Sequence, residues 1–195
     1  MPRFLAPPVA APLGDVTTER MVLRRFAAGD LDALAAVFAA DEVWRFPYGR
    51  GFTRDETAAF LESQLAHWAE CRFGCWFASD RETGEAIGFV GLSVPMFLPE
   101  VLPAVEVGWR FHPAWWGRGL ATEGAVAALT EGFTTLGLDE IVSVPQDGNP
   151  ASARVAERIG MRLDRRVVIP ATDRREELVG LLYVMTADEW WASRA

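Results

Sequence analysis

The stretch of sequence that decides the fold is residues 104–136, AVEVGWRFHPAWWGRGLATEGAVAALTEGFTTL. Its first eight residues have the apolar pattern of a strand, and residues 120–136 have that of a helix. Between them, Trp116-Gly-Arg-Gly-Leu-Ala121 contains two glycines, which allow a sharp turn and the close approach of a ligand to the backbone. The N–H groups and the dipole of a helix start favour an anion at this point, and Arg118 could add a charged contact. The segment therefore predicts a pyrophosphate site, although six residues of this kind also form ordinary tight turns.

A second polar pair, Asn149 and Ser152, lies about thirty residues further along the chain. It follows a short apolar strand at residues 141–144 and begins a helix that ends at Gly160. Both residue types are common helix caps, so a purely structural role is open. Adjacent parallel strands with polar groups at their carboxyl ends form a cleft for a ligand. We therefore expect this pair and the glycine turn to share one cleft.

The rest of the chain carries further strand and helix signals. Strands are predicted over residues 21–26, 73–79, 85–92, 162–169 and 177–186. Asp30 can cap a helix over residues 31–38, and Thr53 and Thr186 each begin a capping box that opens a helix. Loops are predicted around Trp44–Gly51 and over Val94–Pro103. These elements predict one α/β or α+β domain with a mixed sheet, spanning residues 16–195.

Composition restricts the classes of function. The 195 residues suit one domain, and a hydrophobic fraction of 50% with eight Trp and twelve Phe supplies a core. The net charge of −8 argues against nucleic acid as a partner and suits a cationic substrate such as an amine. All nineteen basic residues are Arg, so no lysine is available to form a Schiff base.

The chain lacks the patterns of a secreted, membrane or metal protein. Residues 1–15 are apolar but interrupted by four prolines, which predicts a flexible arm rather than a signal peptide. No apolar run reaches transmembrane length, so we expect a soluble, cytoplasmic protein with no membrane partner. Cys71 and Cys75 do not combine with the two histidines at zinc-site spacing. We expect no metal and two thiols that act as small buried hydrophobes.

Two segments resemble motifs of the GNAT superfamily of N-acetyltransferases. The segment from Glu106, EVGWRFHPAWWGRGLATEG, resembles motif A, with Trp116 where many members have Gln or Arg. The segment from Gln146, QDGNPASARVAERIGMR, resembles the helix that follows. The opening TERMVLR at residues 18–24, the N-x-x-S helix start and the final Glu-Trp at residues 189–190 resemble the subgroup that acetylates N-termini of ribosomal proteins (RimJ/RimL-like).

The resemblance covers about residues 17–191 and implies both fold and cosubstrate. The implied fold is α/β, or mixed α+β: a single mixed, mostly antiparallel twisted sheet with helices on both faces and a splayed pair of central strands. Acetyl-CoA would lie between the ends of the strands at 104–111 and 141–144. The residues that would bind it are Trp109, Phe111, Trp116, Gly117, Arg118, Gly119, Leu120, Ala121 and Asn149.

The implied reaction is direct attack of a neutral amine on the thioester. Ser152 would protonate the leaving thiolate, and a backbone N–H of the 104–111 strand would stabilise the oxyanion. Glu106 is the first candidate for the base that removes the amine proton, although a solvent-facing or ion-paired role is equally open. Tyr48 and Glu56 are weaker candidates on the substrate side.

Several alternatives remain open from the sequence. The amine could belong to a peptide N-terminus or a small molecule, and a homodimer is possible. Apolar residues at 96–98 and aromatic ones at 44, 46 and 48 could form a substrate wall, a dimer contact or core. Alternative functions are another acyl transfer, such as succinyl transfer or antibiotic modification, and non-catalytic acyl-CoA binding. Glu106 and Ser152 argue against pure binding, which needs neither.

Overall fold

The strands form one eight-stranded sheet in a computed structural model that describes residues 4–194. Across the sheet they are β1 (Val16–Thr17), β2 (Met21–Arg24), β3 (Cys75–Asp80), β4 (Ala86–Ser93), β5 (Glu106–Phe111), β6 (Glu140–Ser143), β8 (Leu178–Thr186) and β7 (Arg162–Ile169). Every neighbouring pair is antiparallel except β5 and β6, which are parallel. The predicted mixed, mostly antiparallel sheet is confirmed.

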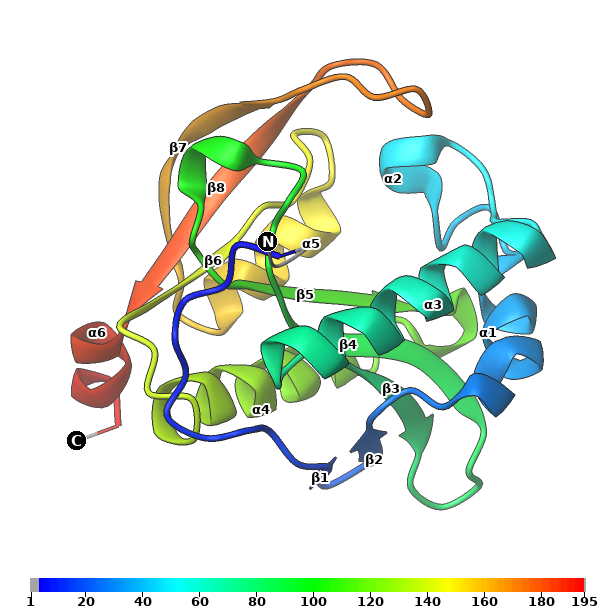
Figure 1. Ribbon diagram of the computed structural model, residues 1–195, viewed down its shortest axis with the longest axis horizontal. Coiled ribbons are helices and arrows are strands. Elements are labelled where there is room, and N and C mark those ends of the chain that lie inside the picture. Colours follow the sequence, from blue (N-terminus) through cyan, green and yellow to red (C-terminus); the bar gives the residue numbers. More distant parts are fainter. Residues whose placement is uncertain (1–3, 195) are drawn as a thin grey trace.

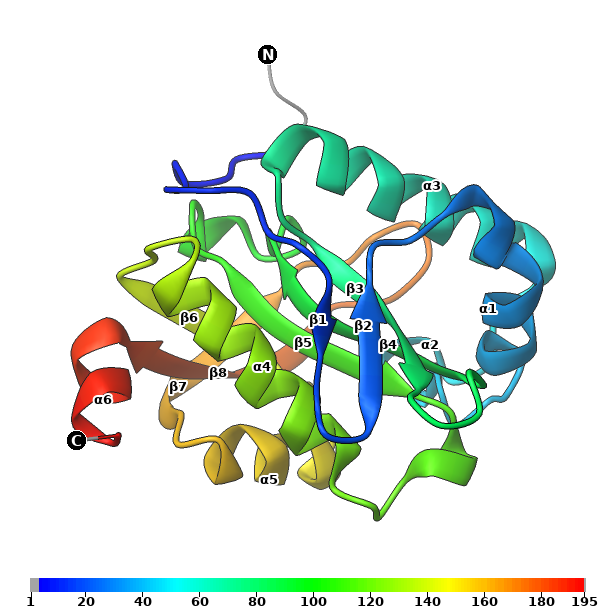
Figure 2. The same cartoon turned by 90° about the horizontal axis from the view of Figure 1, so that it is seen from below.

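The helices cover both faces of this sheet (Figures 1 and 2). They are α1 (Leu31–Phe38), α2 (Arg45–Tyr48), α3 (Arg54–Cys71), α4 (Leu120–Thr134), α5 (Pro150–Arg158) and α6 (Ala187–Ala192). The capping boxes at the starts of α3 and α6 form as predicted. The short helix α2 lies in a segment predicted as loop.

Asp30 does not cap α1 with its side chain, contrary to our expectation. Its carboxylate instead accepts a hydrogen bond from the Ala27 N–H at 2.7 Å and pairs with Arg24 at 2.6 Å. The Arg24 guanidinium and the Ala27 N–H occupy both oxygens of the Asp30 carboxylate. The side chain therefore has no oxygen left to cap α1.

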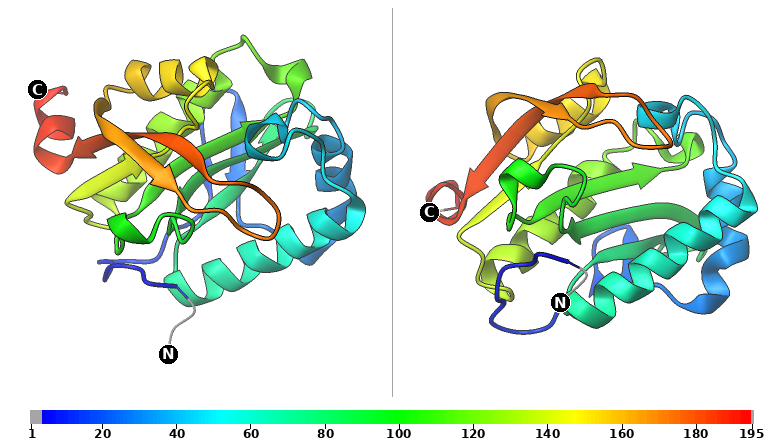
Figure 3. Two further views of the ribbon diagram at one scale, coloured as in Figure 1. Left: turned by 90° about the horizontal axis from the view of Figure 1, so that it is seen from above. Right: turned by 45° about the horizontal axis from the view of Figure 1, so that its top comes forward.

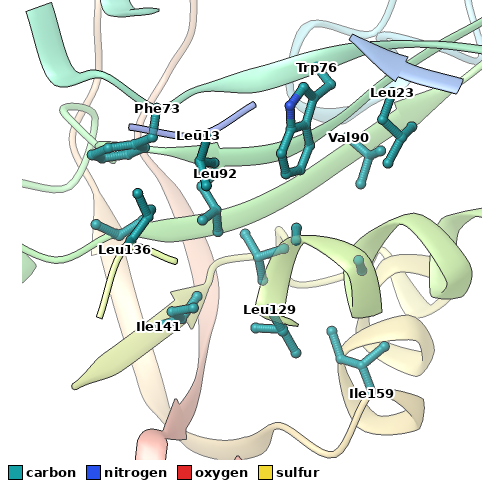
Figure 4. Close-up of a cluster of buried hydrophobic side chains, with 14 of the residues drawn as sticks. Leu13, Leu23, Phe73, Trp76, Val90, Leu92, Leu129, Leu136, Ile141 and Ile159 are labelled. Carbon is teal, nitrogen blue, oxygen red and sulfur yellow. The ribbon is translucent and has the colours of Figure 1, made fainter. Parts of the chain in front are cut away.

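Alternation along the strands divides the core into clusters on opposite faces. On β3, Trp76 and Ala78 pack with residues of α4, whereas Cys75 and Phe77 pack with residues of α1 and α3. Figure 4 shows part of the first cluster, in which Leu129 of α4 faces the strands. Both cysteines are buried, as predicted.

A third cluster covers the other half of the sheet. Leu98, from the segment predicted as a loop, is buried there against residues of β6, β7 and β8. Val107 on β5, and Val105 just before it, belong to the cluster on the α4 side. Glu106 therefore faces the opposite side, between the second and third clusters.

The first residues are packed, unlike the flexible arm that the prolines predicted. Leu13 is buried, and its N–H donates to the Arg72 carbonyl at 3.0 Å. The Ala10 N–H donates to the Leu136 carbonyl at 2.9 Å. The apolar character of this stretch supplies core contacts, and prolines do not prevent such packing. The part of the predicted arm at positions 1–3 lies outside the described residues.

The two parallel strands are joined at one point. Glu106 pairs with Val142, and no further pair forms between β5 and β6. Beyond it the strands diverge, as the views in Figure 3 show. The predicted splayed pair is confirmed, and it opens the middle of the sheet. Over residues 4–194, none of the helices has the length and apolar character needed to span a bilayer.

Candidate active site

A cleft of about 800 Å³ lies where β5 and β6 part. Most of the predicted site residues line it: Tyr48, Glu106, Trp109, Phe111, Trp116, Gly117, Gly119, Leu120, Ala121, Asn149 and Ser152. They come from α2, β5, the starts of α4 and α5, and the turns before those two helices. One cleft thus collects residues more than a hundred positions apart in the chain.

The edge of β5 that faces β6 offers backbone groups without a strand partner. The Val142 N–H donates to the Val105 carbonyl at 2.9 Å, which shows that Val105 directs its backbone toward β6. Because strand backbone alternates, Val107, Trp109 and Phe111 direct theirs to the same edge. The indole of Trp116 donates to the Phe111 carbonyl at 2.7 Å. The edge at Trp109, beyond the pairing of Glu106 with Val142, therefore fits an extended amide-containing ligand, such as a pantetheine arm.

The turn before α4 has the geometry of an anion site. Gly117 and Gly119 have φ values of 73° and 78°, in the left-handed region that favours glycine. Gly119 is the N-cap residue and provides no side chain to bond the first N–H groups of α4. These groups and the helix dipole suit a pyrophosphate.

Asn149 has the structural role that its residue type allows. Its Oδ1 accepts a hydrogen bond from the Ser152 N–H at 3.3 Å and so caps α5. The Ser152 hydroxyl forms no hydrogen bond with any residue between 4 and 194. It lines the cleft and is available to a ligand there.

Glu106 lies at the point where the strands separate. Its Oε1 accepts a hydrogen bond from the Val144 N–H at 3.3 Å, across the gap between β5 and β6. Burial raises the pKa of this carboxyl to about 8, while the Val144 N–H and the charge of Arg110 oppose the rise. A carboxylate with such a pKa can take up a proton near neutral pH.

Two predicted site residues lie outside the cleft. The guanidinium of Arg118 is 4.8 Å from the centroid of the Trp115 ring. The backbone carbonyl of Arg118 accepts a hydrogen bond from the Arg20 side chain. The Glu56 carboxylate caps α3 and pairs with Arg50 and Arg174, each at 2.7 Å. Hydrogen bonds from Arg50 hold the pKa of Glu56 well below its usual range, which removes it as a base.

The cleft also contains buried polar atoms that were not predicted from the sequence. Among the described residues, the buried side-chain nitrogen and oxygen atoms without a hydrogen-bond partner are Trp44 Nε1, Gln64 Oε1, Arg110 Nε and Gln146 Oε1, and all four residues line the cleft. A signal for Arg110 did exist, because it stands four positions after Glu106 on a strand and so shares its face.

The loop between β7 and β8 reaches over to α2 and α3 (Figure 1). Its Arg174 pairs with Glu56 at 2.7 Å and lies 5.3 Å from the ring centroids of Tyr48 and Phe52. Arg175, the next residue, lines the cleft. This loop thus connects β7 and β8 to the segment that contains α2 and the start of α3. Within the described part of the chain, no three His, Cys, Asp or Glu side chains gather as a metal site.

The fold and cleft define a single α/β unit that can hold an extended ligand between two parting parallel strands. The sequence matches the family described as the Acetyltransferase (GNAT) domain over residues 20–162. It is 30% identical over 147 residues to the uncharacterized N-acetyltransferase YoaA of Bacillus subtilis, covering 74% of this chain and 81% of that protein.

Solved structures agree with this assignment. An acetyltransferase from Agrobacterium tumefaciens superposes with a TM-score of 0.72 and 31% identity, over 92% of this chain and 98% of that one. A ribosomal-protein alanine acetyltransferase from Vibrio fischeri shares the fold, with a TM-score of 0.70 and 17% identity over 90% and 98% of the two chains. The chain therefore belongs to the GNAT acetyltransferase family, and as a member it is an acetyl-CoA-dependent N-acetyltransferase.

Proposed function

We propose that the protein transfers the acetyl group of acetyl-CoA to a primary amine, on a peptide N-terminus or a small molecule, by direct attack. The observation that carries this proposal is the Glu106 carboxylate, with its pKa raised to about 8, beside the unpaired edge of β5. A base and backbone N–H donors then stand at the same end of the cleft. A protein that only bound acyl-CoA would need no such base.

The residues divide the work of binding and proton transfer. The edge at Trp109 holds the pantetheine arm, and the N–H groups at Gly119–Ala121 hold the pyrophosphate. Glu106 accepts the proton of the amine, directly or through water. The amine nitrogen forms its bond to the acetyl carbon, and a β5 N–H stabilises the developing oxyanion. The C–S bond then breaks, the Ser152 hydroxyl gives the departing sulfur its proton, and the serine regains a proton from the new amide nitrogen, directly or through water.

The finer assignment within the family also belongs to this proposal. The TERMVLR opening and the Glu-Trp near the carboxyl end support a RimJ/RimL-like relationship. The named activity of the Vibrio fischeri structure, on a ribosomal protein, supports a peptide N-terminus as one acceptor to test.

The test is an acceptor screen with purified protein and acetyl-CoA. Peptides, polyamines, aminoglycosides and amino acids are incubated with the enzyme, and free CoA thiol and acetylated product are measured together. We expect amine-dependent thiol release with an equal amount of N-acetyl product. Tight acetyl-CoA binding with no acetylation of any amine would instead identify a binding module, and activity with succinyl-CoA alone would identify a different donor.

A further inference from the structure

Arg110 is a half-buried cation that lines the cleft and has no carboxylate within ion-pair distance among residues 4–194. Its Nη1 donates to the carbonyls of Val43 and Phe46, the latter at 2.9 Å. Its guanidinium carbon lies 3.9 Å from the centroid of the Trp44 ring. These contacts fix the plane of the guanidinium and leave its other edge, Nε and Nη2, without a hydrogen bond to the described chain.

The free edge has the geometry of an anion receptor. Parallel N–H groups at Nε and Nη2 match the two oxygens of a carboxylate in a bidentate pair. The indole nitrogen of Trp44, the ring that the guanidinium covers, is also buried without a partner among residues 4–194, and Trp44 lines the same cleft. Burial lowers the pKa of Arg110 to about 10, and a bound anion would offset that cost. The donors on Arg110 and Trp44 therefore suit a ligand that brings oxygen atoms.

The same region presents flat apolar surfaces. We use the term aromatic wall for the cleft-lining residues Trp44, Phe46, Tyr48, Phe60 and Phe89. Trp44 stacks on Phe52 at 3.8 Å with an interplanar angle of 5°, and Phe60 contacts Phe89 at 5.1 Å. Because Trp44, Tyr48, Phe60 and Phe89 are in ring contact with one another, this part of the aromatic wall is a preformed surface for a flat group.

The floor of the cleft places Arg110 opposite the proposed base. Glu106, Gly108 and Arg110 share one face of β5, with the first and last Cα atoms about 13 Å apart at strand spacing. A Cβ at Gly108 would meet no atom within 4 Å, so the floor between the two charged residues is open. The charges of the two side chains affect each other's pKa, so a small ligand with an amine beside Glu106 and an anion beside Arg110 would match both charges.

We propose that the acceptor is an amine that carries a carboxylate and a flat apolar group, with the carboxylate bound by the Nε–Nη2 edge of Arg110 and the apolar group against the aromatic wall. This inference rests on the acetyl transfer proposed above, and it makes Arg110 a specificity-determining residue. Amino acids with aromatic or large apolar side chains, and their conjugates, belong to this class.

The first test needs no acetyl transfer. Calorimetry measures binding of 3-phenylpropanoate and of 3-phenylpropan-1-ol, which has the same ring and chain without the charge, with and without CoA. We expect the carboxylate to bind roughly 10- to 100-fold more tightly to the wild type, as a charge-assisted pair provides. Arg110→Met should remove the difference, and Arg110→Lys should keep only part of it.

A matched control separates this contact from the general positive charge of the cleft. Arg175→Met removes a different guanidinium that lines the same cleft, from the loop between β7 and β8. It should leave the preference for the carboxylate over the alcohol unchanged. Circular dichroism and CoA binding check that each variant is folded. Equal binding of the two ligands by the wild type, no binding of either, or an equal effect of Arg175→Met would overturn the proposal.

The second test uses turnover. The ratio of kcat/KM for L-phenylalanine to that for phenethylamine should favour the amino acid in the wild type and fall at least tenfold in Arg110→Met. A preference that survives in Arg110→Met would contradict the role of Arg110. If carboxylates bind through Arg110 but no amine is acetylated, the acetyl transfer fails while the binding site stands.

Discussion

At the scale of single residues, the proposed mechanism depends most on Glu106. The carboxyl must be ionised to accept a proton, and its pKa is raised to about 8. The rate should therefore rise with pH up to about 8 and then level off. Glu106→Gln keeps the hydrogen bond to the Val144 N–H but removes basicity, so turnover should fall by roughly 100-fold or more and the rise should disappear. A pH–rate profile of both proteins measures this.

Two controls separate Glu106 from other groups that titrate. Glu42→Gln changes another carboxylate that lines the cleft and should keep the wild-type profile. If the amine of the acceptor titrates instead, the rise should move with the pKa of the acceptor in wild type and Glu106→Gln alike. A wild-type profile in Glu106→Gln would transfer the base role to solvent or another residue.

The raised pKa of Glu106 also predicts how stability depends on pH. The unfolded chain loses this proton near pH 4, whereas the folded protein keeps it to about pH 8. The unfolded state therefore binds fewer protons in that range, and this carboxyl makes the folded protein less stable as pH rises. Thermal unfolding across this range should show a smaller decline for Glu106→Gln than for wild type. Identical declines would contradict a buried environment for the group.

Ser152 is the residue that should affect chemistry without affecting donor binding. Ser152→Ala should lower turnover by roughly ten- to a thousand-fold while acetyl-CoA affinity stays near the wild-type value. Ser63→Ala, on α3 and away from the cleft, is the matched control. Steady-state kinetics and calorimetry together measure both quantities. Full activity of Ser152→Ala would leave this serine only as part of the start of α5.

At the scale of elements, the turn into α4 should control donor binding. Gly119→Asp puts a side chain and a negative charge where the pyrophosphate would lie, so acetyl-CoA binding should become undetectable. Gly84→Asp is a control, because Gly84 also has a positive φ, 73°, and its surroundings in the turn between β3 and β4 are open. Calorimetric titration compares the two. Equal binding by both variants would place the pyrophosphate elsewhere.

Elements whose signals are local could be predicted from the sequence. The capping boxes at Thr53 and Thr186 act within four residues, and both formed where the sequence indicated. β1 was missed because two residues of strand carry too short a pattern and are defined by pairing with β2. The bridge from Arg174 to Glu56 joins residues 118 positions apart, a relation that periodicity does not contain.

The same distinction explains what was found and missed in the site. The glycine turn and Glu106 follow from residue type and strand alternation, so the sequence predicted them. Arg110 shares that alternation, but its missing partners become visible only when Val43 and Phe46 fold over it. The residue type of Glu56 makes it a site candidate in the sequence. In the folded protein it pairs with Arg50 and Arg174 and lies outside the cleft, which residue type does not reveal.

At the scale of the whole molecule, we propose that residues 16–195 form one domain that unfolds as a unit. Leu129 is fully buried in the largest cluster, and Leu129→Ala should lower the free energy of unfolding by about 2–5 kcal/mol. Leu163→Ala, at a side chain 53% exposed on β7, should change it by about 0.5 kcal/mol or less. Circular dichroism and tryptophan fluorescence during urea unfolding should give one coincident transition. Two separate transitions would contradict a single domain.

The single pairing of Glu106 with Val142 has a mechanical consequence. The part of the sheet made of β1–β5 and the part made of β6, β8 and β7 have no other strand pairing between them, so a change in the angle between them would act on the side-chain packing of the cluster that they share and not on further strand pairs. The hydrogen bond from the Val144 N–H to Glu106 lies next to this pairing, whereas the Arg174–Glu56 ion pair links the β7–β8 loop to α3 at a distance from it. A small change in this angle would therefore move Arg174 relative to Glu56 more than it moves Val144 relative to Glu106. The Arg174–Glu56 distance is thus the most sensitive measure of how wide the cleft is.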